Sequence, residues 1–356
     1  MRVPQDIHQT IIEMIDCGRR FAVAVVLQAE GSTPRGVGAK AAVDVDGTIQ
    51  GTIGGGQVEA ETQRRAVEAL QDGFPTVLDF NLECGTTADS EPTCGGKMRV
   101  LIDPSAARHR AAYEAAATTL KRRERGALLT RMRGSDPPEV SVEFLDEGSI
   151  SQGPEFPGAE AILATLQHER PGRFVSQPTA AAERLEALVE PVIPRPVLLI
   201  IGGGHVGQAL AMQSSLVGFD VAVIDDRAEF TRPALFPEGT ATRCGKIADE
   251  VARFPLDDDT YVVIVTRGHE HDAQALAACL HRPTAYLGMI GSRRKVALMR
   301  KDFVASGRAT AAEFDRVYAP IGLDVGSVTV PEIATSIVAQ LIAVRRRGDA
   351  PRIPSR

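Results

Sequence analysis

The chain has 356 residues, a formal net charge of −6 at pH 7, 44% hydrophobic residues and 24% charged residues. This balance is typical of a globular protein, and the length allows two domains that each bury a core. The acidic balance argues against a protein whose main task is to hold nucleic acid. No apolar run approaches the roughly 18 residues of a membrane-spanning helix, and the first residues lack an apolar signal core. We therefore expect a cytoplasmic protein with no membrane partner.

The cysteines are odd in number and dispersed, which does not fit a disulfide framework. No Cys-x-x-Cys pair occurs, so a structural zinc site has little support and we assign no metal. If a cysteine matters for function, we expect it to act as a thiolate. The five cysteines are Cys17, Cys84, Cys94, Cys244 and Cys279.

The first half of the chain predicts a mixed α/β domain. The Asp46-Gly47 pair lies between two segments of alternating polarity, a pattern typical of a hairpin. Apolar residues at helical spacing and short β-branched runs predict the other elements. We expect helices at 5–17 and 57–70, a loop at 148–157, and strands at 21–28, 41–45, 48–53, 76–81, 97–102, 127–132, 140–144 and 185–190.

Three prolines, Pro191, Pro194 and Pro196, mark the best domain boundary, which predicts domains at 1–193 and 194–356. Beyond them, strands and helices alternate in the pattern of a parallel sheet with right-handed crossovers. We therefore expect an α/β protein in which a Rossmann-type doubly wound domain follows the mixed domain. Its expected strands are 197–201, 220–224, 261–266 and 285–290, and its expected helices are 205–216 and 273–280.

A dinucleotide-binding fingerprint, G-x-G-x-x-G, spans Gly202–Gly207. The pattern alone is weak, but it follows a predicted strand, opens a predicted helix, and is followed by acids at the end of the next strand. Gly202 allows a tight turn, Gly204 lets the backbone approach a phosphate, and Gly207 lets helix and strand pack closely. The N–H groups at the helix start, from His205 onward, would face the anion, and Asp225 or Asp226 could accept from a ribose hydroxyl. The alternative is a domain that keeps these glycines for packing alone.

A second glycine run, Gly54-Gly55-Gly56, precedes a predicted helix and could also hold an anion with its N–H groups. Glu59 falls in the first turn of that helix. A turn that needs only positive φ angles is the alternative.

Cys94-Gly95-Gly96 would expose a thiol on a turn whose free N–H groups favour the thiolate. The alternative is a small buried residue, since free cysteine is among the most buried residue types. Cys84 could pair with Cys94 only under oxidising conditions.

Two polar segments follow predicted strands of the second half, where open α/β sheets place ligands. His269-Glu270-His271-Asp272 could hold a metal or act as acid and base, although the His-x-His spacing then requires a loop. Solvated turn residues are the alternative, which we favour over a metal site. Gly291-Ser292-Arg293-Arg294-Lys295 brings three cations to the same rim. The cluster could meet phosphate, with Arg293 as a candidate contact, or a partner's acidic surface. The alternative is a helix start whose cations are simply solvated.

Taken together, these motifs resemble the xanthine dehydrogenase accessory factor family (XdhC/CoxI type). The match runs in order from about Gly31 to Arg345. Its motifs are Gly31-Ser32-Thr33-Pro34-Arg35, Gly51-Thr52-Ile53-Gly54-Gly55-Gly56 with Glu59, Cys94-Gly95-Gly96, Gly202–Gly207, Asp225-Asp226-Arg227, Gly291-Ser292-Arg293-Arg294, Pro320-Ile321-Gly322-Leu323 and Pro331-Glu332-Ile333-Ala334.

The resemblance implies an accessory chaperone that binds molybdenum cofactor, as molybdopterin or its dinucleotide form. It implies sulfuration of the cofactor with a cysteine desulfurase and insertion into an apo molybdenum hydroxylase such as xanthine dehydrogenase. Cys94 would contact the cofactor or its sulfur, and the glycine loops would hold its phosphate or nucleotide extension. The segment Thr266–Asp272 departs from the family's usual Thr-His-(Asp/Asn)-x-x-x-Asp pattern, and about 108–191 carries no motif of the family.

Two other functions remain open. An NAD(P)-dependent oxidoreductase would use the Rossmann domain, with His269 or His271 as acid or base, but it leaves Cys94 without a role. A regulatory protein could instead sense a nucleotide through that domain. We expect a homodimer, because most soluble oligomers have twofold symmetry.

Overall fold

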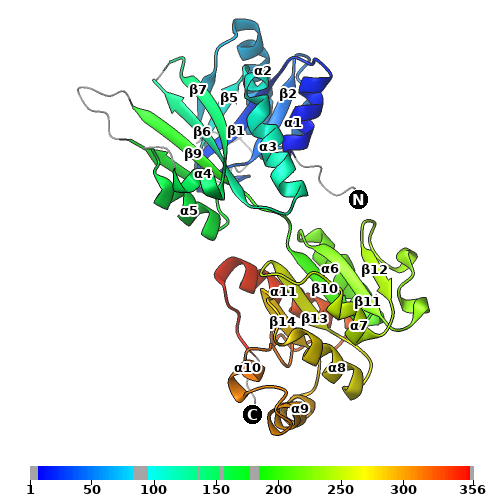
Figure 1. Ribbon diagram of the computed structural model, residues 1–356. Coiled ribbons are helices and arrows are strands. Elements are labelled where there is room, and N and C mark those ends of the chain that lie inside the picture. The colour runs from blue at the N-terminus through cyan, green and yellow to red at the C-terminus, as the bar shows by residue number, and fades with distance from the viewer. Residues whose placement is uncertain (1–6, 83–94, 135, 153–155, 177–183, 353–356) are drawn as a thin grey trace. The chain divides into compact units, whose positions relative to one another are not determined.

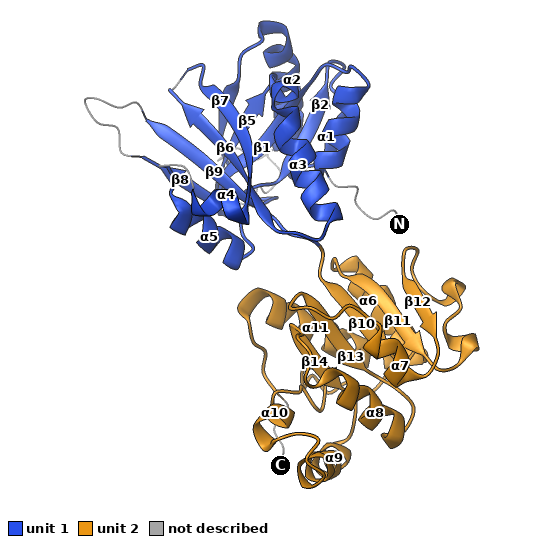
Figure 2. Ribbon diagram, in the orientation of Figure 1, with its two compact units in different colours: residues 1–194 blue, residues 195–356 orange. Residues whose placement is uncertain are grey.

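The computed structural model describes residues 7–82, 95–134, 136–152, 156–176 and 184–352. The chain divides into two compact units, unit 1 at Met1–Pro194 and unit 2 at Arg195–Arg356 (Figure 2). Over the described ranges, no helix combines the length and the apolar character needed to cross a membrane. We describe each unit by itself.

The first sheet of unit 1 has five antiparallel strands in the order β3-β2-β1-β5-β4. The hairpin predicted around Asp46-Gly47 is confirmed by the pairing of β2 with β3. One face of the sheet packs on helix α2 through small aliphatic side chains such as Ala24, Val26 and Ala66. These elements are β1 (Phe21–Gly31), β2 (Lys40–Asp44), β3 (Ile49–Gly51), α2 (Gly56–Asp72), β4 (Thr76–Asn81) and β5 (Gly96–Asp103).

The second sheet of unit 1 has four antiparallel strands in the order β7-β6-β9-β8. One face packs on α5, and the other meets the first sheet through a core that includes Leu27, Leu101 and Leu188. Helices α1 and α3 pack together beside this contact (Figure 1). The elements are α1 (Ile7–Asp16), α3 (Arg110–Lys121), β6 (Gly126–Arg133), β7 (Glu139–Asp146), α4 (Glu147–Ser151), α5 (Ala159–Gln167), β8 (Gly172–Val175) and β9 (Leu185–Val192).

The loop expected at 148–157 is wrong in part, because its first residues belong to the short helix α4. The carboxylate of Asp146 caps this helix by accepting from the backbone N–H of Ser149, a local contact that favours a helical turn despite the Ser and Gly content.

Unit 2 has a parallel five-stranded sheet in the order β12-β11-β10-β13-β14, which confirms the predicted Rossmann-type fold. Helices α6 and α11 pack on one face, and α7, α8, α9 and α10 on the other. The strand order switches between β10 and β13, and open α/β sheets bind ligands at the carboxyl ends of the strands beside such a switch point. The elements are β10 (Val197–Ile201), α6 (His205–Leu216), β11 (Asp220–Asp225), β12 (Ala241–Cys244), α7 (Ile247–Ala252), β13 (Thr260–Ile264), α8 (His269–Cys279), β14 (Tyr286–Met289), α9 (Arg293–Ala305), α10 (Ala311–Asp315) and α11 (Val330–Arg347).

A row of aromatic rings crosses one face of this sheet. Phe219 meets Tyr261 edge-on at 5.2 Å between ring centroids, Tyr261 stacks on Tyr286 at 6.1 Å, and Tyr286 stacks on Tyr318 at 4.7 Å. The buried amide of Gln340 accepts the Tyr286 hydroxyl at 2.6 Å, which satisfies the one polar atom of that buried ring. The row therefore joins the sheet to helix α11.

Candidate functional site

The glycine loop of unit 2 is held by close backbone contacts at two of its positions. Gly202 has a φ of +118°, and a Cβ there would lie 2.4 Å from the carbonyl oxygen of Val265. A Cβ at Gly207 would lie 2.0 Å from the carbonyl oxygen of Gly202. These two glycines are therefore required for the turn and for the packing of α6 against the loop, as the fingerprint predicts.

Gly204 is different, because a Cβ built there meets no atom within 4 Å. It is the N-cap of α6, and no side chain caps the helix. The first N–H groups of a helix have no partner within the helix, and the helix dipole favours an anion beside them. His205, the first residue of α6, is exposed. The loop thus has open space in front of unpaired donors, which fits a phosphate.

Asp225 ends β11 and its carboxylate is already hydrogen-bonded within the unit. It accepts from the backbone N–H of Gly203 at 2.8 Å and from the Arg227 guanidinium at 2.9 Å from both Nε and a terminal nitrogen. Burial raises the pKa of Asp225, but the hydrogen bonds from Arg227 and Gly203 outweigh it and hold the pKa below its ordinary value. Asp225 therefore positions the glycine loop, and the neighbouring Asp226 has the more exposed carboxylate.

Cations surround the same edge of the sheet. The Arg227 guanidinium lies 3.9 Å above the ring of Phe230, and Arg267 lies 3.9 Å from the carboxylate of Asp226. Arg293 is exposed at the start of α9 and lies 3.8 Å from Asp324. Each of these cations lies beside a carboxylate, so the rim carries charges of both signs.

The segment His269–Asp272 does not form the loop that a His-x-His metal site requires. Helix α8 begins at His269, after Gly268 at a φ of +89°. Asp272 is fully buried, where it accepts from the Thr266 hydroxyl and pairs with Lys295. Over the described residues, no group of three or more metal-binding side chains is present. Asp272 instead joins the ends of β13 and α9.

In unit 1, the carboxylate of Glu59 occupies the turn at Gly54–Gly56. Its Oε2 accepts from the Thr52 hydroxyl at 2.7 Å and from the N–H groups of Ile53 and Gly55 at 3.2 Å. Burial raises the pKa of Glu59, but these hydrogen bonds outweigh it and lower the pKa overall. The chain therefore supplies its own anion to part of this glycine run, and the role predicted for Gly54, Gly55 and Gly56 in holding a cofactor stays a prediction.

Cys94 lies outside the described residues, as does Cys84, so the predicted role of the thiol stays a prediction. The two glycines that follow Cys94 are described. A Cβ at Gly96 would lie 2.5 Å from the carbonyl oxygen of Ser32, and Gly95 accepts from the Ser32 N–H at 3.2 Å. Gly96 thus lets β5 approach the end of β1.

Charged residues buried between the two sheets of unit 1 were not predicted from the sequence. Lys40 donates to Glu190 at 2.9 Å, and Glu186 pairs with Arg173 at 2.7 Å. The signal that could have found them is the alternation in Leu185–Val192, where the two glutamates occupy the same strand face as Leu188.

Comparison with known proteins gives matches over both units. The model of the XdhC and CoxI family matches residues 14–81, and the model of the XdhC Rossmann domain matches residues 198–341. The chain is 27% identical over 91% of its length to an uncharacterized protein, YqeB, of Escherichia coli, of which it spans only 43%. It is 24% identical over 96% of its length to a protein of Bacillus subtilis that is named as a probable component of xanthine dehydrogenase, of which it covers 98%.

A third relative, the molybdenum cofactor insertion chaperone PaoD of Escherichia coli, is 22% identical over 96% of this chain and 89% of its own length. A crystal structure described as a xanthine dehydrogenase from Bacillus halodurans has the same fold, with a TM-score of 0.71, 23% identity, and coverage of 96% of this chain and 98% of its own. The fold is that of an α/β protein whose second unit is a Rossmann-type domain. The chain belongs to the XdhC and CoxI family.

Proposed function

We propose that this protein is an accessory protein that binds molybdenum cofactor and passes it to a molybdenum hydroxylase of the xanthine dehydrogenase kind. Membership of the XdhC and CoxI family and the names of two relatives support the proposal. The observation that carries it is the open space at Gly204, in front of the uncapped start of α6. A phosphorylated cargo fits there without a change in the loop.

The cargo would be molybdopterin or its dinucleotide form, and its phosphate would accept from the first N–H groups of α6. Arg293 and the other cations of the rim would attract the anion and then compete with solvent for it. Cys94, as a thiolate, would contact the molybdenum or its terminal sulfur while a cysteine desulfurase supplies that sulfur. The homodimer and the cytoplasmic location belong to the same proposal.

Equilibrium binding tests the proposal. Purified full-length protein is titrated with molybdopterin and with its dinucleotide form, and bound pterin is measured by fluorescence after oxidation. We expect saturable binding of one form by the wild type. A wild type that binds neither form would rule the proposal out. Cys94→Ala adds a second readout, since we expect it to reduce activation of the client enzyme more than it reduces binding of the pterin.

An NADP-dependent oxidoreductase is the second candidate, and the position of Arg227 favours it. An arginine just beyond the acid that ends the second strand accommodates a 2′-phosphate in NADP-binding Rossmann folds. Titration with NADPH and NADH separates the two functions. Tight binding of NADPH with no affinity for molybdopterin would favour the enzyme, with His269 or His271 as acid or base.

A further inference from the structure

Strand β9 of unit 1 carries two buried glutamates on the face that packs against the first sheet. Side chains alternate along a strand, so Glu186, Leu188 and Glu190 share one face, while Ala187 and Val189 pack toward α5. Both glutamates are buried, and a buried charge is costly unless it is paired. Their partners therefore decide whether this interior is balanced in charge.

Glu190 is paired with one cation. Its Oε2 accepts from Lys40 at 2.9 Å, and the side chain of Lys40 is only 3% exposed. The charges of the Glu190 carboxylate and the Lys40 ammonium cancel, so the pair is neutral.

Glu186 is surrounded by three guanidinium groups. Arg173 donates to its Oε1 at 2.7 Å, which is a normal hydrogen bond. Arg99 and Arg184 approach Oε2 only to 3.6 Å and 3.7 Å, beyond hydrogen-bonding distance. One carboxylate therefore faces three positive charges, and two of them make no hydrogen bond to it.

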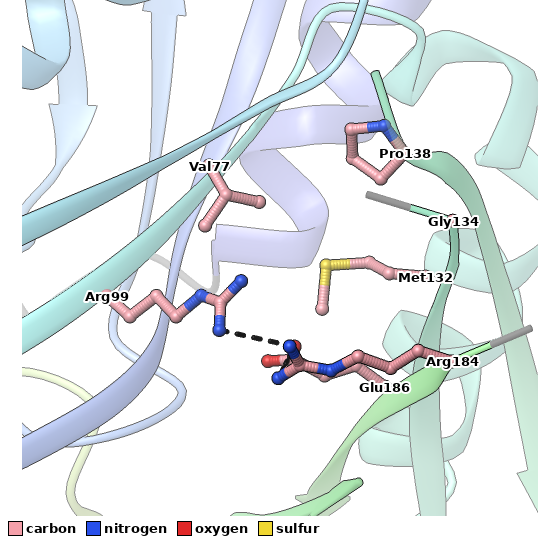
Figure 3. Close-up of a pocket in the computed structure, with 7 residues that line it drawn as sticks. All are labelled: Val77, Arg99, Met132, Gly134, Pro138, Arg184 and Glu186. Carbon is pink, nitrogen blue, oxygen red and sulfur yellow. Dashed lines mark ion pairs between the residues drawn. The ribbon is translucent and has the colours of Figure 1, made fainter. Parts of the chain in front are cut away.

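These two arginines line a cavity of about 70 Å³ between the sheets (Figure 3). Val77 and Met132 form its apolar part, while Arg99, Arg184 and Glu186 form its polar part. A single water needs roughly 10–15 Å³ measured in this way, so the cavity has room for several waters or one small polyatomic ion.

Arg99 is the least satisfied member of the cluster. Among the described residues it donates no hydrogen bond, and its buried Nε has no hydrogen-bond partner. Its other carboxylate neighbour, Asp79, lies at 3.6 Å and is 77% exposed, so solvent screens that pair. A guanidinium recognises oxyanions in a planar, bidentate geometry. The donors of Arg99 therefore suit an oxyanion that could accept two hydrogen bonds.

We propose that this cavity is a binding site for a free tetrahedral oxyanion of the phosphate and sulfate class. The anion accepts hydrogen bonds from Arg99 and Arg184 and balances the positive charge that Glu186 leaves over. The cavity belongs to unit 1 and the glycine loop to unit 2, and the oxyanion is inferred without use of the proposed function. We restrict the proposal to an inorganic ion, because the cavity has room for one small polyatomic ion.

Binding is measured on the full-length protein by calorimetric titration with inorganic phosphate and with sulfate, in a buffer free of other oxyanions. We expect saturable binding by the wild type. Arg184→Gln removes one donor at a position that is 49% exposed, so we expect the fold to tolerate it and the affinity to fall about tenfold to a hundredfold. Glu186→Gln removes the competing carboxylate, so the affinity should rise.

Arg131→Gln is the matched control. Arg131 lies on β6 beside Met132 and pairs with Glu143, so its loss removes the same charge from the same sheet without touching the cavity. Circular dichroism of each variant without anion confirms that it is folded. Absence of saturable binding by the wild type would overturn the proposal, as would an equal loss of affinity in Arg131→Gln and Arg184→Gln. Equally tight binding of glycerol phosphate would contradict the restriction to inorganic ions.

Discussion

The carboxylate of Asp225, at the end of β11, accepts a hydrogen bond of 2.8 Å from the backbone N–H of Gly203, in the loop after β10. This bond joins neighbouring strands through the loop that would receive a phosphate. An acid at this position of a Rossmann fold often binds a ribose hydroxyl. Here the same acid is held by Gly203 and Arg227, so we assign it to positioning of the loop.

Asp225→Asn should therefore destabilise unit 2. The variant loses charge-assisted hydrogen bonds to Arg227 and Gly203, which we expect to lower the free energy of unfolding by about 1.5–3 kcal/mol at neutral pH. Urea unfolding followed by circular dichroism measures the change. Asp226→Asn is the matched control, because its neighbouring carboxylate is more exposed, and it should unfold like the wild type.

The same variant has a defined pH dependence. The pKa of Asp225 is lowered in the folded protein from its ordinary value of 3.8. A lowered pKa stabilises the folded state above the ordinary value, and that stabilisation is lost as the pH falls through the native pKa. Wild type and Asp225→Asn should therefore converge in stability in strong acid. A stability difference that stays constant as the pH falls well below 3.8 would contradict the role of the ionised carboxylate.

Gly204→Ala should weaken binding without loss of stability, whereas Gly207→Ala should lower stability. Gly204 has a φ of −68° and open space at its Cβ, so alanine should leave stability unchanged or slightly higher, while its methyl group occupies the phosphate position. We expect the cofactor to bind at least about tenfold more weakly. Gly207→Ala should instead lower the free energy of unfolding by about 1–3 kcal/mol, because its Cβ would collide with Gly202. Thermal unfolding and pterin titration of both variants give the comparison.

Glu59→Gln tests the internal anion of unit 1. The glutamine amide keeps one acceptor oxygen, but it loses the negative charge that the Thr52 hydroxyl and the Gly55 N–H bind in the wild type. We therefore expect the free energy of unfolding to fall by about 1 kcal/mol. Because the pKa of Glu59 is lowered, its stabilisation depends on pH in the same way as that of Asp225. It is present at neutral pH and is lost in acid. Glu61→Gln, on the exposed side of the same helix, is the control and should change stability little. Equal losses in the two variants would contradict the assignment.

Lys295→Met should destabilise unit 2, because it removes the cation that pairs with the fully buried carboxylate of Asp272. We expect a loss of about 1.5–3 kcal/mol in the free energy of unfolding. The double variant Asp272→Asn with Lys295→Met should recover part of it, because no buried charge is then left without a partner. Arg294→Met, exposed on the same helical turn, is the control. Denaturant unfolding measures the stability of all three variants. If the double variant were the least stable of them, the pairing of Asp272 with Lys295 would be refuted.

The fold class of unit 2 was predicted from the sequence, but its strand β12 and its helices α7, α9, α10 and α11 were not. The strand Val197–Ile201 and the helix His205–Leu216 have the predicted bounds, because a fully buried parallel strand is a continuous apolar run that a glycine loop ends. Helices α3 and α5 of unit 1 were not predicted. The buried residues of α3 include alanines and threonine, whose small side chains give a weak apolar stripe in the sequence even though they pack tightly.

For the candidate site, the sequence predicted which residues take part but not which atoms they contact. The fingerprint indicated which glycines matter, but the sequence did not distinguish the crowded Gly207 from the open Gly204, since that depends on which backbone atoms lie nearby. It also predicted an acid at Asp225 without indicating that Arg227 binds it. Glu186 was missed for the same reason. Arg173 reaches it through the pairing of β8 with β9, and Arg99 reaches it only after the two sheets have packed.

The row of rings in unit 2 gives the protein an intrinsic spectroscopic probe of that unit. The protein has no tryptophan and four tyrosines, and Tyr261, Tyr286 and Tyr318 are all in that row, which leaves only Tyr113 in unit 1. Immobilised, closely stacked phenols dominate the near-ultraviolet circular dichroism of such a protein. That signal should follow the melting of the Rossmann unit, while the far-ultraviolet signal follows both units, so the two can be resolved in one sample without a label.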